Sequence, residues 1–279
     1  MHNSSNISLL LQKLVVVSLL CFVLNACNEQ AEKEAPPKET VTNSSFSLPF
    51  SWELDAETMS GDTIISIPNE FLFKKDKNYR AFPLKENLDA LLPKDLDRTG
   101  LQIIFRCTDG YAPGMPLYLI DSNYAYLAFR DMDLGTDEKA WGDSLQAKFA
   151  PFYTVWEKYP VDGVKVPWAY GVYEIEINEF TEEYKNSIPT DDTFADGFQL
   201  FQNKCMKCHS INMEGGQMGP EFNHPRNITT YWQKEHIWEY VQNPQSFRYN
   251  SKMVPIKDLS RAEFEAIYAY LEHIKEKKL

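Results

Sequence analysis

The sequence is poor in several features that mark whole classes of protein. Its 279 residues include only five cysteines, too few for a scaffold held together by disulfides. Basic residues are in the minority, with 28 Lys and Arg against 40 Asp and Glu. The resulting net charge of −12 argues against a general nucleic-acid binder, because such proteins need basic surface to neutralise phosphates.

What remains is the composition of a globular protein. Hydrophobic residues make up 43% of the chain and aromatic residues 14%, so most of it can fold around a core. The length fits one large domain or two small ones. The pattern of the sequence changes near residue 181, which favours two.

The first 26 residues have the character of an export signal. Lys13 precedes an apolar run of 11 residues, 14–24, which reads LVVVSLLCFVL. This run is shorter than the about 20 residues that a membrane-spanning helix needs, and it matches the hydrophobic part of a secretory signal peptide. We therefore predict a signal peptide at 1–26 and an exported protein. A short buried helix is the alternative.

The end of this run indicates a lipid anchor. Leu24-Asn25-Ala26-Cys27 resembles the lipobox of bacterial lipoproteins, which implies that Cys27 is lipidated and holds the protein on the periplasmic side of a membrane. Ordinary signal cleavage beside a bystander cysteine is the alternative. Residues 27–45 are polar and contain prolines, so we predict a flexible tether between the lipid anchor and the globular part.

Residues 46–180 have the pattern of a β-rich domain. Short runs of β-branched and aromatic residues are separated by turn-forming sequences. In the last run, residues 172–177 alternate between polar and apolar, which predicts a strand with one wet face. A short helical turn is expected at 87–92. The predicted strands are 63–67, 101–105, 116–120, 152–156 and 170–177.

Residues 181–193 are polar and contain Pro189, which predicts a linker. The pattern then becomes helical over 194–279. Aromatic and aliphatic residues recur at helical spacing in 194–205 and 232–242. Ser260 and Glu263 form a capping box that opens a last helix.

The strongest motif lies in this helical region. Cys205-Met206-Lys207-Cys208-His209 is C-x-x-C-H, the signature of c-type haem attachment. Two thiols on one turn can reach the two vinyl groups of one porphyrin, and the adjacent histidine can then bind the iron. The other readings are weaker: a structural zinc needs four ligands and no second Cys pair exists, and a thioredoxin-like pair belongs in a βαβ unit. A disulfide before maturation is left open.

A haem held by His209 leaves a sixth coordination position on the iron. Met253 lies in a loop with Pro255 just before the capped last helix, and its sulfur favours ferrous iron, which raises the reduction potential. We predict Met253 as this ligand. His224, His236 or an open position are the alternatives.

The landmarks of 190–279 resemble a class I monohaem cytochrome c domain. This resemblance implies that the carbonyl of Pro220 supports the proximal histidine ring, that Gly197 lets the first and last helices cross closely, and that Phe201 packs near Ile267 and Tyr270. Val254 separates Met253 from Pro255, where the family often has Met-Pro. The resemblance rests on Gly197, Phe201, Cys205, Cys208, His209, Gly219-Pro220, Asn243-Pro244, Met253 and Ala269-Tyr270-Leu271.

The front region carries a second resemblance. Parts of residues 100–180 are similar to a reduced form of the sulfite-oxidase-type, molybdopterin-binding domain. Cys107 is the only candidate thiolate ligand for molybdenum, and no set of basic residues for a pterin phosphate stands out, so molybdopterin is not favoured. The segments concerned are Asp109–Pro113, Pro116-Leu117, Pro151–Trp156 and Trp168–Val172.

Together these features predict an α+β protein of two domains, in which a β-rich sulfite-oxidase-like domain precedes an all-α cytochrome c domain. The expected function is electron transfer by an exported, lipid-anchored protein with one covalent haem c, rather than an enzyme. Its partners would be redox proteins of the respiratory chain or another periplasmic pathway, with a basic docking face that matches the acidic net charge. The alternative is an oxidoreductase in which the front domain binds molybdopterin and oxidises a small substrate.

Overall fold

The structure is a computed structural model, and it describes residues 46–134, 140–142 and 147–277. The predicted signal peptide, the tether and Cys27 lie outside the described residues. Within the described part of the chain, no helix has the length and apolar character needed to cross a bilayer.

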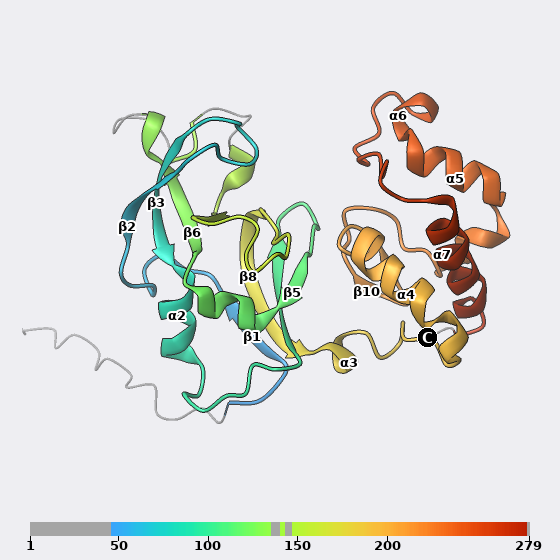
Figure 1. The fold of residues 1–279 in the computed structure, drawn as a ribbon, viewed down its shortest axis with the longest axis horizontal. Helices are drawn as coiled ribbons and strands as arrows, with labels where there is room; N and C mark the ends of the chain where they lie inside the picture. Colours follow the sequence, from blue (N-terminus) through green and yellow to red (C-terminus); the bar gives the residue numbers. More distant parts are fainter. Residues whose placement is uncertain (1–45, 135–139, 143–146, 278–279) are drawn as a thin grey trace, which may run out of the picture. The chain divides into compact units, whose positions relative to one another are not determined.

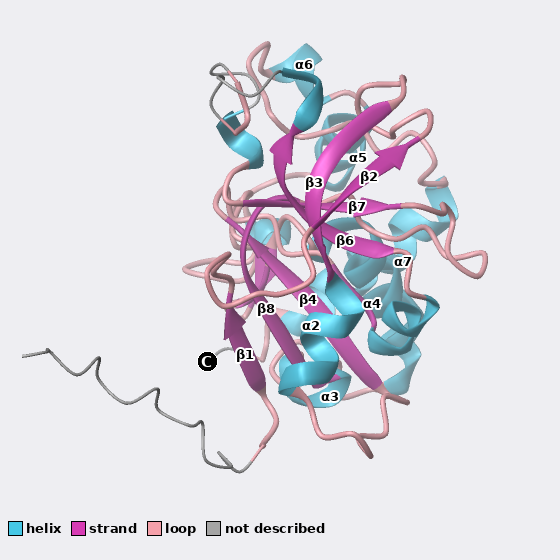
Figure 2. Ribbon diagram, turned by 90° about the vertical axis from the view of Figure 1, so that its left-hand side faces the viewer, coloured by secondary structure: helices cyan, strands magenta, loops and turns pink. Residues whose placement is uncertain are grey.

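The front region is built on one antiparallel sheet, drawn in blue to yellow in Figure 1. Its strands follow the order β2-β3-β6-β7-β8-β4-β5, and β1 pairs with β8 beside this path. Figure 2 shows the strands turning through a large angle between β2 and β8, as expected of a twisted sheet. The strands are β1 (Phe50–Glu53), β2 (Thr63–Ile67), β3 (Lys77–Pro83), β4 (Leu101–Cys107), β5 (Gly114–Pro116), β6 (Ala125–Asp131), β7 (Phe152–Trp156) and β8 (Tyr170–Glu179).

Short helices complete the front region. The helical turn predicted at 87–92 is α2 (Leu84–Leu91). The strand predicted at 116–120 is wrong: Leu117–Ser122 form a 3₁₀ helix, η1, closed by Asn123 in the left-handed conformation at φ 60°. A short apolar run fits either a strand or a helix. Here the chain forms a 3₁₀ helix that buries Leu117, Leu119 and Ile120. Further 3₁₀ turns are η2 (Met132–Leu134) and η3 (Ala147–Phe149).

The last strand departs from simple alternation. The pairing of β4 with β8 shifts register between Arg106 and Cys107, opposite Val172. Val172 and Ile175 are therefore both buried although they are three residues apart, and Tyr173 is exposed. Beyond the irregularity the expected pattern holds, with Ile175 and Ile177 fully buried. A bulge of this kind re-aims side chains at one end of a strand.

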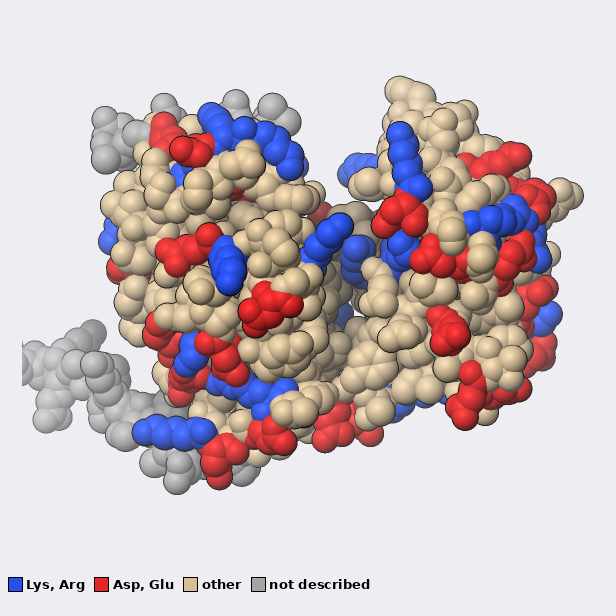
Figure 3. All heavy atoms as spheres, viewed as in Figure 1, with Lys and Arg blue, Asp and Glu red and all other residues tan. Residues whose placement is uncertain are grey.

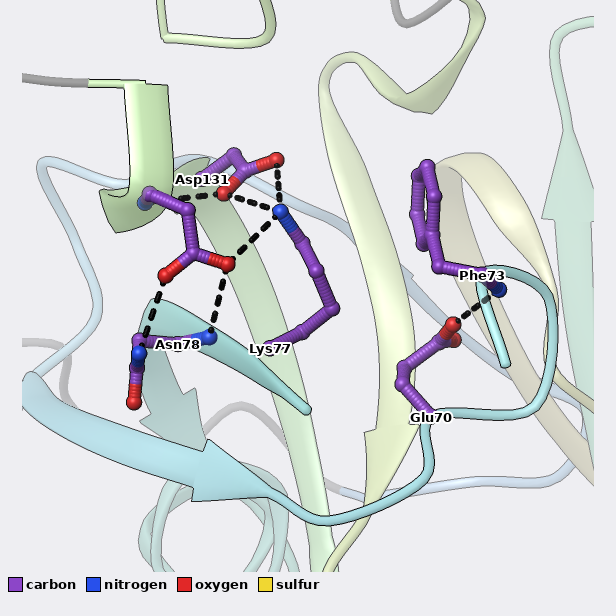
Figure 4. Close-up of polar contacts among 6 residues, drawn as sticks. Glu70, Phe73, Lys77, Asn78 and Asp131 are labelled. Carbon is purple, nitrogen blue, oxygen red and sulfur yellow. Dashed lines mark hydrogen bonds and ion pairs between the residues drawn. The ribbon is translucent and has the colours of Figure 1, made fainter. Parts of the chain in front are cut away.

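Charged side chains buried in the front region are bound by ion pairs or by hydrogen bonds. Lys77 on β3 donates to both carboxylate oxygens of Asp131, at 2.7 and 2.6 Å, and it also meets Asp133 at 2.9 Å (Figure 4). Glu70 is fully buried and accepts from the backbone N–H groups of Leu72 and Phe73 and from the hydroxyl of Tyr153. These contacts satisfy the buried charges, so loss of one partner would leave an uncompensated charge in the core.

The helical region is drawn in orange to red in Figure 1. It has its own core, separate from the two clusters that fill the front region. Its elements are η4 (Asp192–Phe194), α4 (Ala195–Phe201), a π-helical turn η5 (Gln202–Met206), β9 (Ser210–Ile211), β10 (Glu214–Gly215), η6 (Ile228–Thr230), α5 (Lys234–Gln242), α6 (Pro244–Phe247) and α7 (Arg261–Ile274).

Helices α4 and α7 cross closely at a glycine. A Cβ built on Gly197 would lie 2.2 Å from the carbonyl oxygen of Ala266, so only glycine fits. Phe201 packs on Tyr270 with ring centroids 5.6 Å apart. Both features agree with what the cytochrome c resemblance implies. The capping box is confirmed, since Ser260 and Glu263 each accept from the other's backbone N–H.

Three buried asparagines tie the end of α7 to the segment after the C-x-x-C-H motif. Asn223 donates to Asn212 and to the carbonyl of Ile274, and Asn227 donates to Asn223 and to the carbonyl of Leu271. Asn212 in turn donates to the carbonyl of Lys277. The last carbonyls of a helix have no partner within it, and these amides supply one.

The segment predicted as a linker, 181–193, contributes to both regions. It begins within α3 (Phe180–Glu183), in which Glu183 pairs with Arg106 of the sheet at 3.2 Å. Tyr184 is buried in the helical core, and the carbonyl of Ser187 accepts from the Tyr270 hydroxyl at 2.8 Å. The polar sequence therefore packs as part of the fold.

Candidate functional site

The C-x-x-C-H motif begins at the end of the first helix of its domain. Cys205 lies in the π-helical turn that follows α4, and its carbonyl accepts from the backbone N–H groups of Cys208 and His209, both at 3.0 Å. This turn puts the two cysteines on one short loop. Both are half-buried free thiols. Burial raises the pKa of Cys205 to about 12 and also raises the pKa of Cys208.

These thiols are therefore protonated at neutral pH. A redox-active pair needs a lowered thiol pKa, whereas burial raises the pKa of both cysteines here. In the described part of the chain, no group of three or more His, Cys, Asp and Glu side chains could hold a metal ion. The geometry disfavours the zinc and thioredoxin readings and fits two thiols that each add to a vinyl group.

His209 is held in one orientation. It is 9% exposed, and its Nδ1 lies 2.9 Å from the carbonyl oxygen of Pro220. Because a carbonyl can only accept, Nδ1 carries the proton and Nε2 keeps its lone pair. Burial lowers the pKa of His209 despite the opposing hydrogen bond to Pro220, so the ring is neutral at pH 7 and able to bind iron.

Two neighbours fix the plane of this ring. Phe222 stacks on it with ring centroids 4.4 Å apart. A Cβ built on Gly219 would lie 2.3 Å from the Cε1 atom of His209, so a glycine is needed there. The sequence pointed to Gly219-Pro220 but missed Phe222, for which an aromatic residue two positions after the proline was the available signal.

The loop behind the ring is braced by a single carboxylate. Glu221 accepts from the backbone N–H groups of Asn212, Met213 and Asn223, at 3.0, 3.2 and 2.7 Å. The N–H of Gly219 donates to the carbonyl of Cys208 at 2.7 Å. These bonds hold Pro220 against the motif, and sequence reasoning gave no role to Glu221.

Met253 lies apart from this group in the chain, between α6 and α7. It is half-buried. Its carbonyl accepts from Gln245 at 2.8 Å, and its N–H donates to Ser251 at 3.3 Å. These contacts order its loop and leave its role as a ligand a prediction. Of the alternatives, His236 is exposed and packs on Trp232, with ring centroids 4.7 Å apart.

Cys107 sits in a different environment. It is 4% exposed, its thiol donates to the carbonyl of Phe105 at 3.7 Å, and burial raises its pKa. A thiol of this kind behaves as a small apolar residue. The Arg106 guanidinium pairs with Glu176 at 2.5 Å, and Lys77 is neutralised by Asp131, so these cations are not arranged to receive a phosphate.

A cavity of about 630 Å³ opens beside α2 in the front region. Arg98 in its wall is paired with Asp89 and with Asp121. Lys85 is also paired with Asp89, so most of the charged groups in the wall bind one another. The cavity carries no functional assignment.

Comparison with known proteins places the helical region in a family. The cytochrome c family model matches residues 194–275. The chain is also similar to cytochrome c oxidase subunit 2 of Alkalihalophilus pseudofirmus, with 30% identity over 99 aligned positions. That match covers 31% of this chain and 27% of the relative, so the chain spans about a quarter of the relative's length. No solved structure matches the chain.

The family match and the geometry agree. Two protonated thiols on one loop and a neutral histidine with a free Nε2 are the groups that a covalent haem requires, and the turn, Pro220 and Gly219 hold them in place. Neither comparison supports a sulfite-oxidase-type identity for the front region, which stays a resemblance of sequence alone. Residues 194–275 match the cytochrome c family model, and a cytochrome c domain implies covalently bound haem c.

Proposed function

We propose that the protein is an exported, lipid-anchored electron carrier with one haem c, attached through Cys205 and Cys208 and ligated by His209 and Met253. The observation that carries the proposal is the hydrogen bond between His209 Nδ1 and the Pro220 carbonyl, because it fixes the tautomer that leaves Nε2 for iron. Haem c, when bound, supplies a one-electron couple between ferric and ferrous iron. The protein's own residues hold it and bind no substrate.

The residues around the motif support electron transfer because they restrict the movement of the two proposed iron ligands. Phe222, Gly219 and Glu221 restrict the histidine ring and its loop. Ser251 and Gln245 fix the backbone of Met253. Ligands that do not move between oxidation states keep the reorganisation energy small, which favours rapid electron transfer.

The charge of the chain is unevenly divided between its regions. Residues 194–279 contain 11 Lys and Arg and 10 Asp and Glu, whereas residues 1–193 contain 17 and 30. Figure 3 shows acidic and basic side chains interspersed on the face in view. A partner that docks on the cytochrome domain alone thus meets a nearly neutral surface, and the basic docking face expected from the total charge applies only to a partner that also meets the front region.

The similarity to an oxidase subunit favours respiratory proteins as the partners. The enzyme alternative would need Cys107 as a thiolate, and its burial opposes that state. We therefore propose electron transfer without a second cofactor.

Replacement of Met253 tests the ligand assignment. Met253→Ala should abolish the iron–sulfur charge-transfer band of the oxidised protein and lower the reduction potential, while Met213→Ala, at a methionine that is 66% exposed, should leave both unchanged. An unaltered spectrum in Met253→Ala would refute the ligand.

Replacement of Cys27 tests the anchor. Cys27→Ser should move the protein from the membrane fraction to the soluble fraction, because the acyl chains are lost. Cys21→Ser, six residues earlier in the apolar run, is the matched control. Membrane association that persists in Cys27→Ser would count against lipidation.

A further inference from the structure

A turn of the front region contacts the haem-attachment loop directly. The N–H of Ala112 donates to the carbonyl of Lys207, which lies between the two motif cysteines, at 2.9 Å. The N–H of Gln217 donates to the carbonyl of Gly110 at 2.7 Å. Two backbone hydrogen bonds of opposite direction thus join residues 110–112 to Lys207 within the C-x-x-C-H motif and to Gln217 in the segment that follows it.

The approach is close enough to require a glycine. A Cβ built on Gly110 would lie 2.8 Å from the carbonyl carbon of Gln217 and 2.8 Å from the nitrogen of Met218. Real side chains essentially never approach backbone this closely. Gly110 also has a φ of +85°, which glycine adopts without strain.

Side chains of this turn and of β8 interact electrostatically with Cys208. Burial is the main cause of the raised pKa of Tyr111, and Cys208 raises this pKa further. Tyr170 of β8 and Asp109 also act on Cys208 electrostatically. Asp109 is exposed and accepts from the N–H of Tyr111 at 3.0 Å, which shapes the turn.

We propose that residues 108–113 form an intramolecular cap over the Cys208 edge of the haem, which shields that edge from water and from redox partners. This inference rests on the proposed haem attachment. It gives the front region a role that needs no cofactor. Because the front region covers one edge of the haem, electrons enter and leave through a different edge.

In the proposed cap, Asp109 acts electrostatically on the Cys208 side of the site, and this has a measurable consequence. Oxidised haem carries one more positive charge than reduced haem, so a nearby anion stabilises the oxidised form and lowers the reduction potential. Asp109→Asn keeps the oxygen that accepts from Tyr111 but removes the charge. Its holoprotein should have a higher reduction potential than the wild type, with an unchanged spectrum.

Asp97 offers a matched control for the charge. It accepts from the N–H of Thr99 at 2.9 Å, in the same arrangement as Asp109 with Tyr111, and it lies in a turn of the front region that is remote in sequence from the cap. Asp97→Asn should leave the potential unchanged. Equal potentials in Asp109→Asn and Asp97→Asn would overturn the assignment of the cap.

Hydrogen exchange of the holoprotein tests the contact itself. The amides of Ala112 and Gln217 should be protected in the wild type, and Gly110→Ala should speed exchange in peptides spanning 108–113 and 214–219 by about tenfold or more, because the turn must withdraw. Gly100→Ala is the control: its φ is +79°, and a Cβ there meets nothing within 4 Å. Fast exchange of both amides in the wild type, or no difference between the variants, would overturn the cap.

The outcomes separate this inference from the function on which it rests. A colourless protein from a host that matures c-type cytochromes would contradict the haem attachment. A coloured protein with a normal spectrum, whose two glycine variants exchange alike, would contradict the cap alone.

Discussion

The buried Glu70, Lys77 and Cys107 of the front region and the buried His209 of the helical region differ in how they are bound. In the front region Glu70 accepts three hydrogen bonds, Lys77 meets two carboxylates, and Cys107 bonds its own strand. In the cytochrome domain His209 is oriented by Pro220 while its Nε2 makes no hydrogen bond within the described residues. These groups of the front region are thus bound to their neighbours, whereas His209 is oriented by one nitrogen and keeps the other available for a ligand.

Cysteine replacement should separate the regions most sharply. The double variant Cys205→Ser/Cys208→Ser should lose all haem that resists extraction into acidified acetone, because both thioethers are gone. Cys107→Ser, in the front region, should keep full haem content per folded protein. The measurement is the haem absorbance that remains with the precipitated protein. Covalent haem retained by the double variant, or lost by Cys107→Ser, would break the comparison.

The ion cluster should show the largest effect on stability. Lys77→Met leaves Asp131, whose side chain is 1% exposed, as an unpaired buried charge, and should destabilise the front region by about 3–5 kcal/mol. Chemical unfolding followed by tryptophan fluorescence measures this. The double variant Lys77→Met/Asp131→Leu removes the unpaired charge and should recover much of the loss. A single variant as stable as the wild type would show that the pair contributes nothing.

The helix crossing should show a smaller effect in the other region. Gly197→Ala forces a methyl group against the Ala266 carbonyl, and strain of this kind costs about 1–3 kcal/mol. Thermal unfolding of the cytochrome domain, followed at the haem absorbance, should shift to lower temperature, with the front region unaffected. An unchanged transition would mean that α4 and α7 have room to separate.

The smallest expected effect is a dependence on pH. Burial opposes the charge on Asp133, but hydrogen bonds from Lys77 and Asn78 outweigh it, so its pKa is lowered. A carboxyl group with a lowered pKa stabilises the fold above its unfolded pKa of about 3.9 and loses this contribution as the pH falls through its folded value. The stability of the front region should thus decline less steeply below pH 4 in Asp133→Asn than in the wild type. If the wild type and Asp133→Asn lost stability equally as the pH falls, Asp133 would not contribute to the stability of the cluster.

How much the sequence predicts differs between the regions for a physical reason. The cytochrome site is local: Cys205, Cys208 and His209 share one turn, and Pro220 follows within a short loop, so spacing alone brings them together. The strands β2 and β7 were likewise predicted at their observed bounds, because their residues favour strands strongly. The class of fold, β-rich and then helical, followed from the same patterns.

What the sequence did not predict depends on contacts between distant segments. Strand β3 was missed because Lys77 occupies a buried position and hides the alternation of KNYRAFP. The buried charge of Lys77 is tolerated because Asp131 pairs with it. The contact of Gly110 with Gln217 joins residues far apart in the chain, and no local pattern signals it. The helix η1 was taken for a strand because Leu117, Leu119 and Ile120 suit either structure.

The chain of three asparagines couples residues 271–277 to the loops around His209. Asn212, Asn223 and Asn227 tie the turns that flank Pro220 to carbonyls between Leu271 and Lys277. Fusions, tags or truncations that disturb these last residues would therefore loosen the proximal side of the haem pocket, although they lie more than 60 positions after His209.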